Sequence, residues 1–187
     1  MLDAVCIVRL LGFLGLFGAG LLTWTFLEYA IHGWMSHRFA TFVTPLHQVH
    51  HRDPRAVFAL GAWLPALLPI VIGAACGARG WTIFYAGILA GFAAYEILHY
   101  RIHFRAPACR AEARMRARHL IHHYCAPARC FGVTTALWDR VFGTTASGAD
   151  AAAMAVRVAS ILPLDGRSNV AAPGATMRRL IATIATR

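Results

Sequence analysis

The sequence predicts an all-α integral membrane protein with about three transmembrane helices and a helical cap on the cytoplasmic side. Three observations predict this fold. Of the 187 residues, 58% are hydrophobic and only 14% are charged, an apolar excess beyond what one soluble core needs. Three stretches approach the length of about 20 mostly apolar residues that a membrane span requires. All ten histidines fall in the polar segments outside these stretches.

The predicted spans follow one another along the first hundred residues, at about 6–27, 57–76 and 81–98. The first apolar run is too long for the core of a signal peptide, so we expect it to be retained as a helix. Gly77 and Gly80 flank the link between the second and third spans, which predicts a tight helical hairpin. Pro65 and Pro69 lie inside the second span and should kink it.

The arginines predict the topology, because positive residues mark the cytoplasmic side of a membrane helix. Three of them lie in the polar segment after the first span: Arg38, Arg52 and Arg55. Eight more follow the third span: Arg101, Arg105, Arg110, Arg114, Arg116, Arg118, Arg129 and Arg140. The N-terminus is then outside, and the histidines all face the cytoplasm. A basic chain of net charge +10 also suits nucleic acid, but these charges cluster beside apolar stretches, so we expect a membrane and no nucleic-acid partner.

Composition divides the chain into residues 1–145, a membrane domain, and residues 146–187, an Ala- and Arg-containing segment that we expect to be a poorly ordered tail. The five cysteines are odd in number and show no compact disulfide pattern. We therefore expect five free thiols.

The histidines form four short clusters with none outside them. The clusters read HGWMSH, HQVHH, HYRIH and HLIHH. Their members are His32, His37, His47, His50, His51, His99, His103, His119, His122 and His123.

This spacing indicates metal binding, because residues i, i+3 and i+4 of a helix share a face. Each HxxHH cluster can offer up to three imidazoles to one point. Neutral imidazole suits iron, zinc, copper and nickel, and ten candidates exceed the needs of one metal, so we predict two metals with about five histidines each. Haem would need only two to four histidines. A zinc hydrolase would normally carry a carboxylate base, and HExxH is absent. A metal transporter would place its ligands along the transmembrane path.

Four carboxylates stand near the clusters or the basic residues. Glu28 precedes His32 by four residues, and Glu96 precedes His99 by three. Either carboxylate could accept the outer N–H of a ligand imidazole and fix its tautomer. For Asp53 and Asp139 we favour structural roles.

The ordered clusters resemble the fatty acid hydroxylase superfamily, which includes sterol desaturases, and within it the fatty acid 2-hydroxylase group. The matching motifs are Glu28-Tyr29-Ala30-Ile31-His32, HGWMSH, HQVHH, HYRIH, HLIHHY and a closing FGVTTALWDRVFGT. The resemblance covers roughly residues 24–145. It implies that all ten histidines are ligands of a dimetal centre, and each matches by position. Glu96 stands where the group usually has Asp, and the cytochrome b5 domain that eukaryotic members often carry is absent from this sequence.

The resemblance implies an O2-dependent lipid hydroxylase, a monooxygenase that acts on an acyl chain. Because zinc has no redox chemistry, we expect two iron ions in the active enzyme, even where zinc fills the site of purified protein. Electrons would come from a separate protein, cytochrome b5- or ferredoxin-like, since no flavin or haem motif is visible. Two alternatives stay open: a sterol or carotenoid hydroxylase or desaturase of the same superfamily, and a membrane metal-binding protein without activity.

Overall fold

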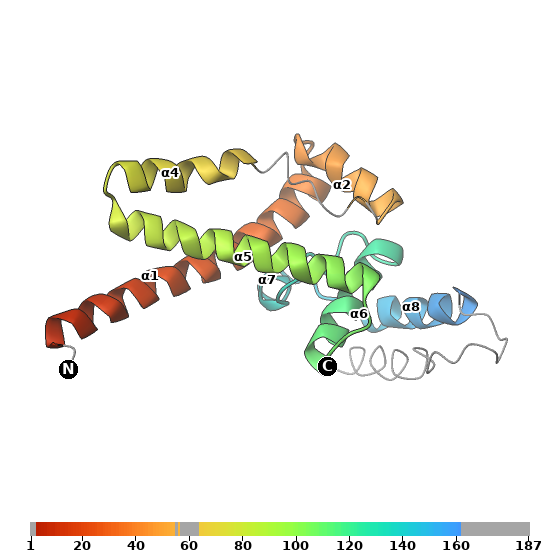
Figure 1. The fold of residues 1–187 in the computed structure, drawn as a ribbon. Helices are drawn as coiled ribbons and strands as arrows, with labels where there is room; N and C mark the ends of the chain where they lie inside the picture. The colour runs from red at the N-terminus through yellow and green to blue at the C-terminus, as the bar shows by residue number, and fades with distance from the viewer. Residues whose placement is uncertain (1–2, 55, 57–63, 162–187) are drawn as a thin grey trace.

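The structure is a computed structural model that describes residues 3–54, 56 and 64–161 of the chain. All regular structure in these residues is helical, as predicted (Figure 1). The first helices are α1 (Ala4–Tyr29), the π-helix η1 (Ala30–Arg38) that continues it, and α2 (Val43–Arg52). The later ones are the 3₁₀ turn η2 (Leu64–Leu67), α4 (Leu68–Ala75), α5 (Arg79–Phe104), α6 (Arg110–Tyr124), α7 (Leu137–Val141) and α8 (Gly148–Ile161).

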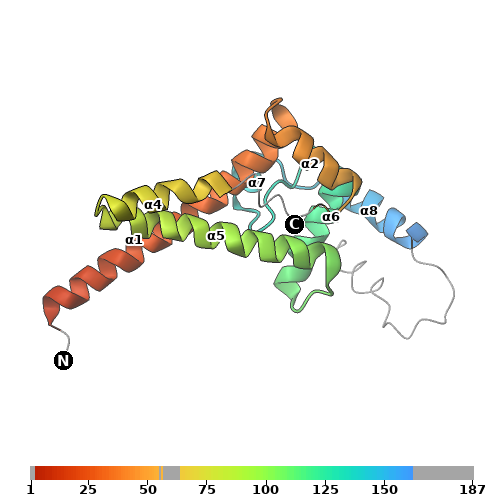
Figure 2. The same cartoon turned by 45° about the horizontal axis from the view of Figure 1, so that its top comes forward.

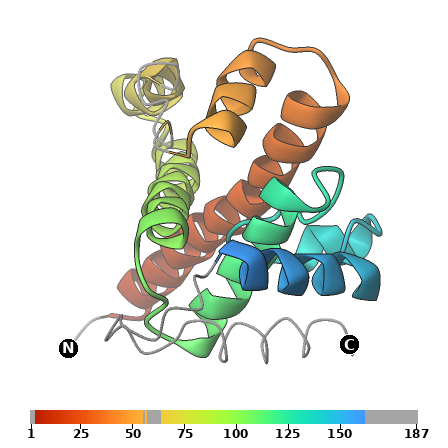
Figure 3. The same cartoon turned by 90° about the vertical axis from the view of Figure 1, so that its right-hand side faces the viewer.

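Two long helices, α1 and α5, cross and form the main contact of the fold. Helix α4 runs back along α5, so that the α4–α5 turn and the N-terminus of α1 lie at the same end of the molecule (Figures 1 and 2). Helices α2, α6, α7 and α8 gather at the opposite end, where Figure 3 looks along the molecule. The fold therefore separates an elongated apolar part from a compact helical part.

Within the described residues, two helices are long and apolar enough to cross a membrane. They are the continuous helix Ala4–Arg38, which contains an 18-residue stretch with a mean hydropathy of 2.2, and Arg79–Phe104, which contains one of 1.4. Many apolar side chains of α1 point away from the protein, Val8 with 68% of its surface exposed. The predicted second span falls partly on residues 57–63, which lie outside the described residues, and its remainder is the shorter apolar helix Leu64–Ala75. The number of spans and the cytoplasmic placement of the cap stay predictions.

Glycines set the close approach of α1 and α5. A Cβ atom on Gly20 would lie 2.0 Å from the Phe84 carbonyl oxygen, and one on Gly87 would lie 2.2 Å from that of Phe17. Small residues let helix backbones approach in this way where lipid surrounds them. The contact fixes how the histidine-bearing ends of the two long helices stand relative to each other.

The proline prediction is corrected by the structure. Pro65 lies in η2 and Pro69 lies in the first turn of α4, so neither kinks a continuous helix within the described residues. A proline is tolerated in a first turn because its missing N–H would have no partner there. The predicted tight link is confirmed: Gly77 adopts a φ of 68°, and α5 begins two residues later.

The tail prediction is wrong for residues 148–161, which form α8. Ala151 and Met154 of α8 are buried against Ile121 of α6, and this apolar contact outweighs the low complexity of the segment. Arg129 and Asp150 add an ion pair of 3.6 Å. Residues 162–187 of the predicted tail lie outside the described residues.

We expect cysteine labelling to reveal the topology. Cys76 and Cys109 are both exposed; Cys76 precedes the start of α5 by three residues, and Cys109 follows its end by five. If the histidine end faces the cytoplasm, a membrane-impermeant maleimide added to intact cells will label a variant that keeps only Cys76 and not one that keeps only Cys109. The reverse pattern would contradict the predicted orientation, and permeabilised cells, where both label, are the control.

Candidate metal centre

The structure brings the ten predicted histidines together in two groups of five. The first histidine group contains His32, His37, His47, His51 and His122. The second histidine group contains His50, His99, His103, His119 and His123. In each group the five facing ring nitrogens all lie within 4.8 Å of one another. These are the only candidate metal clusters within the described part of the chain.

Each HxxHH cluster is divided between the two groups, a split that the spacing did not predict. On α2, His47 and His51 join the first group while His50 joins the second. Residues three and four positions after a given residue point about 100° apart on an α-helix, so adjacent histidines can face different metals. Helix α6 repeats the split in the opposite sense: His119 and His123 join the second group, and His122 joins the first.

The π-helix explains the HxxxxH spacing. On an α-helix, residues five apart point about 140° apart. The wider turn of a π-helix, closed by i→i+5 hydrogen bonds, brings such residues nearly over one another. His32 and His37 lie in η1 and both face the first group. The Ser36 hydroxyl donates to the Ile31 carbonyl, five residues earlier, and so supports the wide turn.

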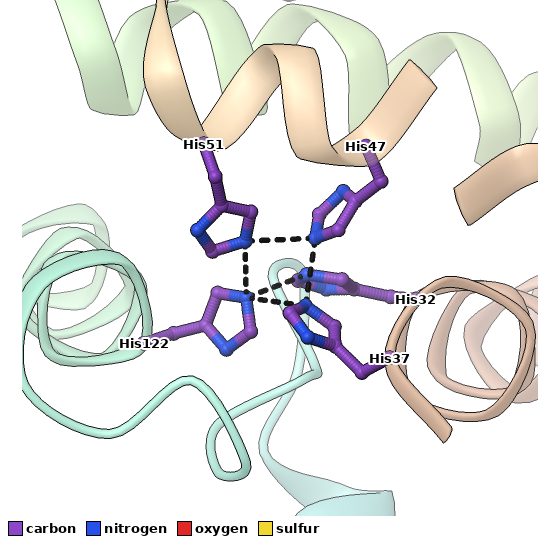
Figure 4. Close-up of side chains that lie close together, drawn as sticks. All are labelled: His32, His37, His47, His51 and His122. Carbon is purple, nitrogen blue, oxygen red and sulfur yellow. Dashed lines mark hydrogen bonds between the residues drawn. The ribbon is translucent and has the colours of Figure 1, made fainter. Parts of the chain in front are cut away.

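In the first group, four Nε2 atoms form a closed ring and the fifth stands beside it (Figure 4). The Nε2 of His122 lies 3.0 Å from that of His51 and 3.1 Å from that of His37. The Nε2 of His47 lies 2.8 Å and 2.7 Å from the same two atoms. The Nε2 of His32 lies 3.0 Å from that of His122. The rings come from three separate elements and converge on one point.

Hydrogen bonds between the rings do not account for this convergence. The Nδ1 of His32 lies 2.5 Å from the Phe131 carbonyl oxygen, and the Nδ1 of His122 lies 2.8 Å from that of Arg129. A carbonyl oxygen only accepts, so both Nδ1 atoms carry the proton. A neutral imidazole has one proton, so the two Nε2 atoms, 3.0 Å apart, face each other with bare lone pairs. Such an arrangement is repulsive unless a cation lies between them.

The nitrogen spacing fits a metal ion. Two imidazole nitrogens at right angles, each about 2.1 Å from a metal, lie about 3.0 Å apart. The adjacent distances in the first group are 2.7 to 3.1 Å. In the second group the Nε2 of His119 lies 3.0 Å from that of His99 and 2.9 Å from that of His103. The Nε2 atoms of His50 and His123 are buried there without a hydrogen-bond partner among the described residues.

Burial keeps the imidazoles neutral. It lowers the pKa of His50 to about 3, with a further contribution from the nearby His103. Burial also lowers the pKa of His119 and His122 well below the ordinary value, and neighbouring imidazoles add to the effect. Only the neutral ring offers a lone pair to a metal. The groups are therefore ready to bind metal near neutral pH.

The segment that carries the Arg129 and Phe131 carbonyls is held by two buried carboxylates. Asp139 accepts from the backbone N–H groups of Phe131 and Gly132, at 2.9 and 3.0 Å. Glu28 accepts from the N–H groups of Val133 and Thr134, at 2.6 and 2.9 Å. The prediction that Glu28 accepts directly from a ligand imidazole is therefore wrong, because its hydrogen bonds go to this segment.

Glu96 does not contact a ligand imidazole in the predicted way either. Its Oε2 atom is buried and has no hydrogen-bond partner among the described residues. Glu96 instead lines a cavity beside the histidines, where its neighbours include His50 and His99. The cavity also reaches the apolar side chains of Trp24 and Phe92. It thus joins an apolar space between α1 and α5 to the candidate metal centre.

Sequence reasoning did not find the two carbonyls that orient His32 and His122. A signal for one of them is the closing FGVTTALWDRVFGT motif, which begins with Phe131 and includes Asp139, whereas Arg129 lies just before it. Tyr29 stacks on Phe142 with ring centroids 5.1 Å apart, and its hydroxyl lies 3.1 Å from the Thr144 hydroxyl oxygen. The motif therefore has a local structural purpose, which is to fasten a loop against the start of η1.

The site and fold define a helical membrane-type protein with two histidine groups that could each hold a metal ion. Comparison with known families agrees: the model of the fatty acid hydroxylase family, described as "Fatty acid hydroxylase", matches residues 17–144. The chain belongs to this family. No solved structure matches the chain.

Several curated proteins are similar to the chain. A dihydroceramide fatty acyl 2-hydroxylase of Arabidopsis thaliana is 34% identical over 152 residues, which cover 67% of this chain and 58% of that protein. A fatty acid 2-hydroxylase of Mus musculus is 32% identical over 155 residues, covering 71% of this chain and 40% of that protein. A ceramide very long chain fatty acid hydroxylase of Schizosaccharomyces pombe is 30% identical, covering 67% and 40%. The matches thus span from about two fifths to three fifths of these relatives' length.

We expect acid to destabilise the metal-free protein from about pH 6.5 downward. The unfolded chain binds protons at its imidazoles below about pH 6.5, whereas folded His50 does so only near its pKa of about 3. The unfolded state then binds more protons, so the free energy of unfolding falls with pH across this window. Thermal unfolding in detergent between pH 8 and pH 4 measures it, and a flat profile below pH 6.5 would contradict neutral buried imidazoles.

Proposed function

We propose that the protein is a membrane-bound dimetal oxygenase that hydroxylates position 2 of a lipid acyl chain, using O2 and electrons from a separate protein. One observation carries the metal part: the bare Nε2 lone pairs of His32 and His122 face each other at 3.0 Å. The substrate part rests on the names of the similar proteins, which are fatty acyl or fatty acid 2-hydroxylases and a ceramide fatty acid hydroxylase.

Each histidine group would hold one metal through five imidazole nitrogens. Iron is the metal we propose for the active enzyme, since zinc has no redox chemistry. When bound, two iron ions supply the capacity to reduce dioxygen and attack an unactivated C–H bond. The protein's own part is to hold ten neutral imidazoles in place, to keep their tautomers fixed, and to exclude bulk water from the buried side of the centre.

The cavity beside the histidines supports an acyl substrate. Its walls include Trp24, Phe92 and Ile31, which suit a hydrocarbon chain, and it touches both histidine groups through His47 and His50. If an acyl chain occupied this cavity, a carbon atom close to its polar head would lie next to the candidate metal centre. The buried carboxyl of Glu96 at the same cavity offers a polar partner where the chain meets a headgroup.

An electron donor would dock at the histidine end of the molecule. The exposed Arg105, Arg110 and Arg114 lie there, at the end of α5 and in the first half of α6. Such a basic surface suits an acidic donor such as a cytochrome b5- or ferredoxin-like protein. The same arginines favour a cytoplasmic location of the centre.

Lipid analysis tests the proposed activity. Cells that make the protein together with a cytochrome b5 or ferredoxin and the matching reductase should accumulate 2-hydroxy fatty acids, measured by mass spectrometry after hydrolysis of the lipids. The new oxygen should derive from ¹⁸O2. His37→Ala and His103→Ala, one from each group, should each lower the product by at least about 100-fold because one metal site loses a ligand.

The control for this experiment is Arg52→Ala, an exposed residue next to the HQVHH cluster that bears no ligand. It should keep the activity of the wild type. Hydroxylation of a sterol or carotenoid instead would assign the protein to a different substrate class. A wild type with full metal content, a functioning donor and no oxidised lipid of any kind would contradict the proposed enzyme.

A further inference from the structure

The two histidine groups differ in how the outer ring nitrogens are held. In the first group, His32 and His122 donate from Nδ1 to backbone carbonyl oxygens. In the second group, the Nδ1 atoms of His99, His119 and His123 are buried with no hydrogen-bond partner among the described residues. An outer hydrogen bond fixes the tautomer and orientation of a ligand and raises its basicity. His32 and His122 of the first group therefore have a backbone support that His99, His119 and His123 of the second group lack.

One peptide group links His32 to a carboxylate. The Phe131 carbonyl oxygen accepts from His32 Nδ1 at 2.5 Å. The N–H of the same peptide belongs to Gly132 and donates to Asp139 Oδ2 at 3.0 Å. Hydrogen bonds in such a chain polarise one another, so a carboxylate on the N–H side makes the carbonyl a better acceptor. The arrangement is a carboxylate–histidine pair with a peptide group inserted between its members.

The surroundings hold this link in one geometry. Asp139 is fully buried, and its Oδ1 also accepts from the Phe131 N–H at 2.9 Å and the Thr144 hydroxyl at 2.8 Å. A Cβ atom at Gly132 would lie 2.0 Å from the Thr135 carbonyl oxygen, so only glycine fits there. Cys130 has a φ of 59°, which most residues avoid, and it turns the chain between the Arg129 and Phe131 carbonyls.

We propose that Asp139 is a positioning residue for the first histidine group. Asp139 acts on His32 through the Phe131–Gly132 peptide and makes the first group the tighter of the two metal sites. The inference rests on the proposed dimetal centre and deepens it. Asp139 has no contact with a ring nitrogen, so its effect on metal is indirect. Loss of an outer-shell partner typically weakens metal binding by about 10- to 100-fold.

The test compares Asp139→Asn with Glu112→Gln. Asn keeps the size of Asp but turns an N–H2 group toward a backbone N–H. Glu112 is the matched control: it is 7% exposed and accepts from the Ala108 N–H at 2.7 Å and from Arg101, but it touches no peptide that accepts from a histidine. Full-length proteins in detergent, loaded anaerobically with iron or cobalt, are dialysed against a graded chelator, and bound metal is counted per chain.

We expect wild type and Glu112→Gln to keep a tightly held metal at chelator concentrations that remove it from Asp139→Asn, a shift of about 10- to 100-fold. Adding His37→Ala to Asp139→Asn should cost no further metal in this window, because both changes act on the first group. His103→Ala alone should leave the tightly held metal in place, because it acts on the second group, which has already released its metal in this window. The order of loss thus assigns the effect to one group.

Other outcomes overturn the inference. Equal loss from both groups in Asp139→Asn, or the same shift in Glu112→Gln, would mean a general loss of stability. An unchanged chelator profile would mean that the peptide link has no role. A wild type that binds fewer than two metals would contradict the proposed function itself. Should Asp139→Asn fail to fold, as judged by circular dichroism and elution profile, Thr144→Val takes its place, because it removes the hydroxyl group that donates to Asp139 Oδ1 and leaves the carboxylate in the chain.

Discussion

The convergence of ring nitrogens with bare lone pairs is the constraint on which the rest of the structure depends. Five imidazoles in each group, from the exposed His37 to the fully buried His122, must stay neutral and point at one place, and such convergence of bare lone pairs is unfavourable without a cation. The clearest instance is the pair His32 and His122, whose Nδ1 protons are committed to carbonyls and whose Nε2 atoms face each other. The helices around the centre hold these rings close together despite the repulsion between their lone pairs.

Each element fixes the position of the imidazole rings in a different way. The glycine contact at Gly20 and Gly87 fixes α1 against α5, so the histidines at the ends of these two helices are placed by one rigid pair. The π-helix η1 turns two histidines five residues apart to the same side. The segment 129–134, fastened by Glu28 and Asp139, supplies the carbonyls that choose the tautomers. The site is therefore built from features far apart in sequence.

Sequence patterns predicted the parts of this design that repeat locally. The helical spacing of HQVHH and HLIHH placed both clusters on helices, and the apolar runs placed α1 and α5. The division of each cluster between the two histidine groups was not predicted, because it depends on where α2 and α6 lie relative to the two long helices. The roles of Glu28 and Glu96 were also missed. Sequence separation from a histidine says nothing about a competing partner such as the Val133 N–H, 105 residues away.

The predictions of a poorly ordered tail and of proline kinks were wrong for a related reason. Low complexity in residues 148–161 predicted disorder, but Ala151 and Met154 find an apolar surface on α6 that only the folded chain offers. Pro69 was expected to kink a long helix, and it starts a short one instead. In each case a tertiary contact or a boundary decided the outcome, whereas the local composition was compatible with either result.

Helices α2 and α6 each carry histidines of both groups, so metal binding would be coupled to the attachment of α2. Among the described elements, α2 packs closely against η1 and makes only slight backbone contact with α5 or α6. The rings of His50 and His51 lie against those of His99 on α5 and of His122 and His123 on α6. When metal binds, the free energy of binding is also the free energy that attaches α2 to the rest of the centre, as in other sites where ligands come from separate elements. The two proposed metal ions would then tie α2 to α5 and α6.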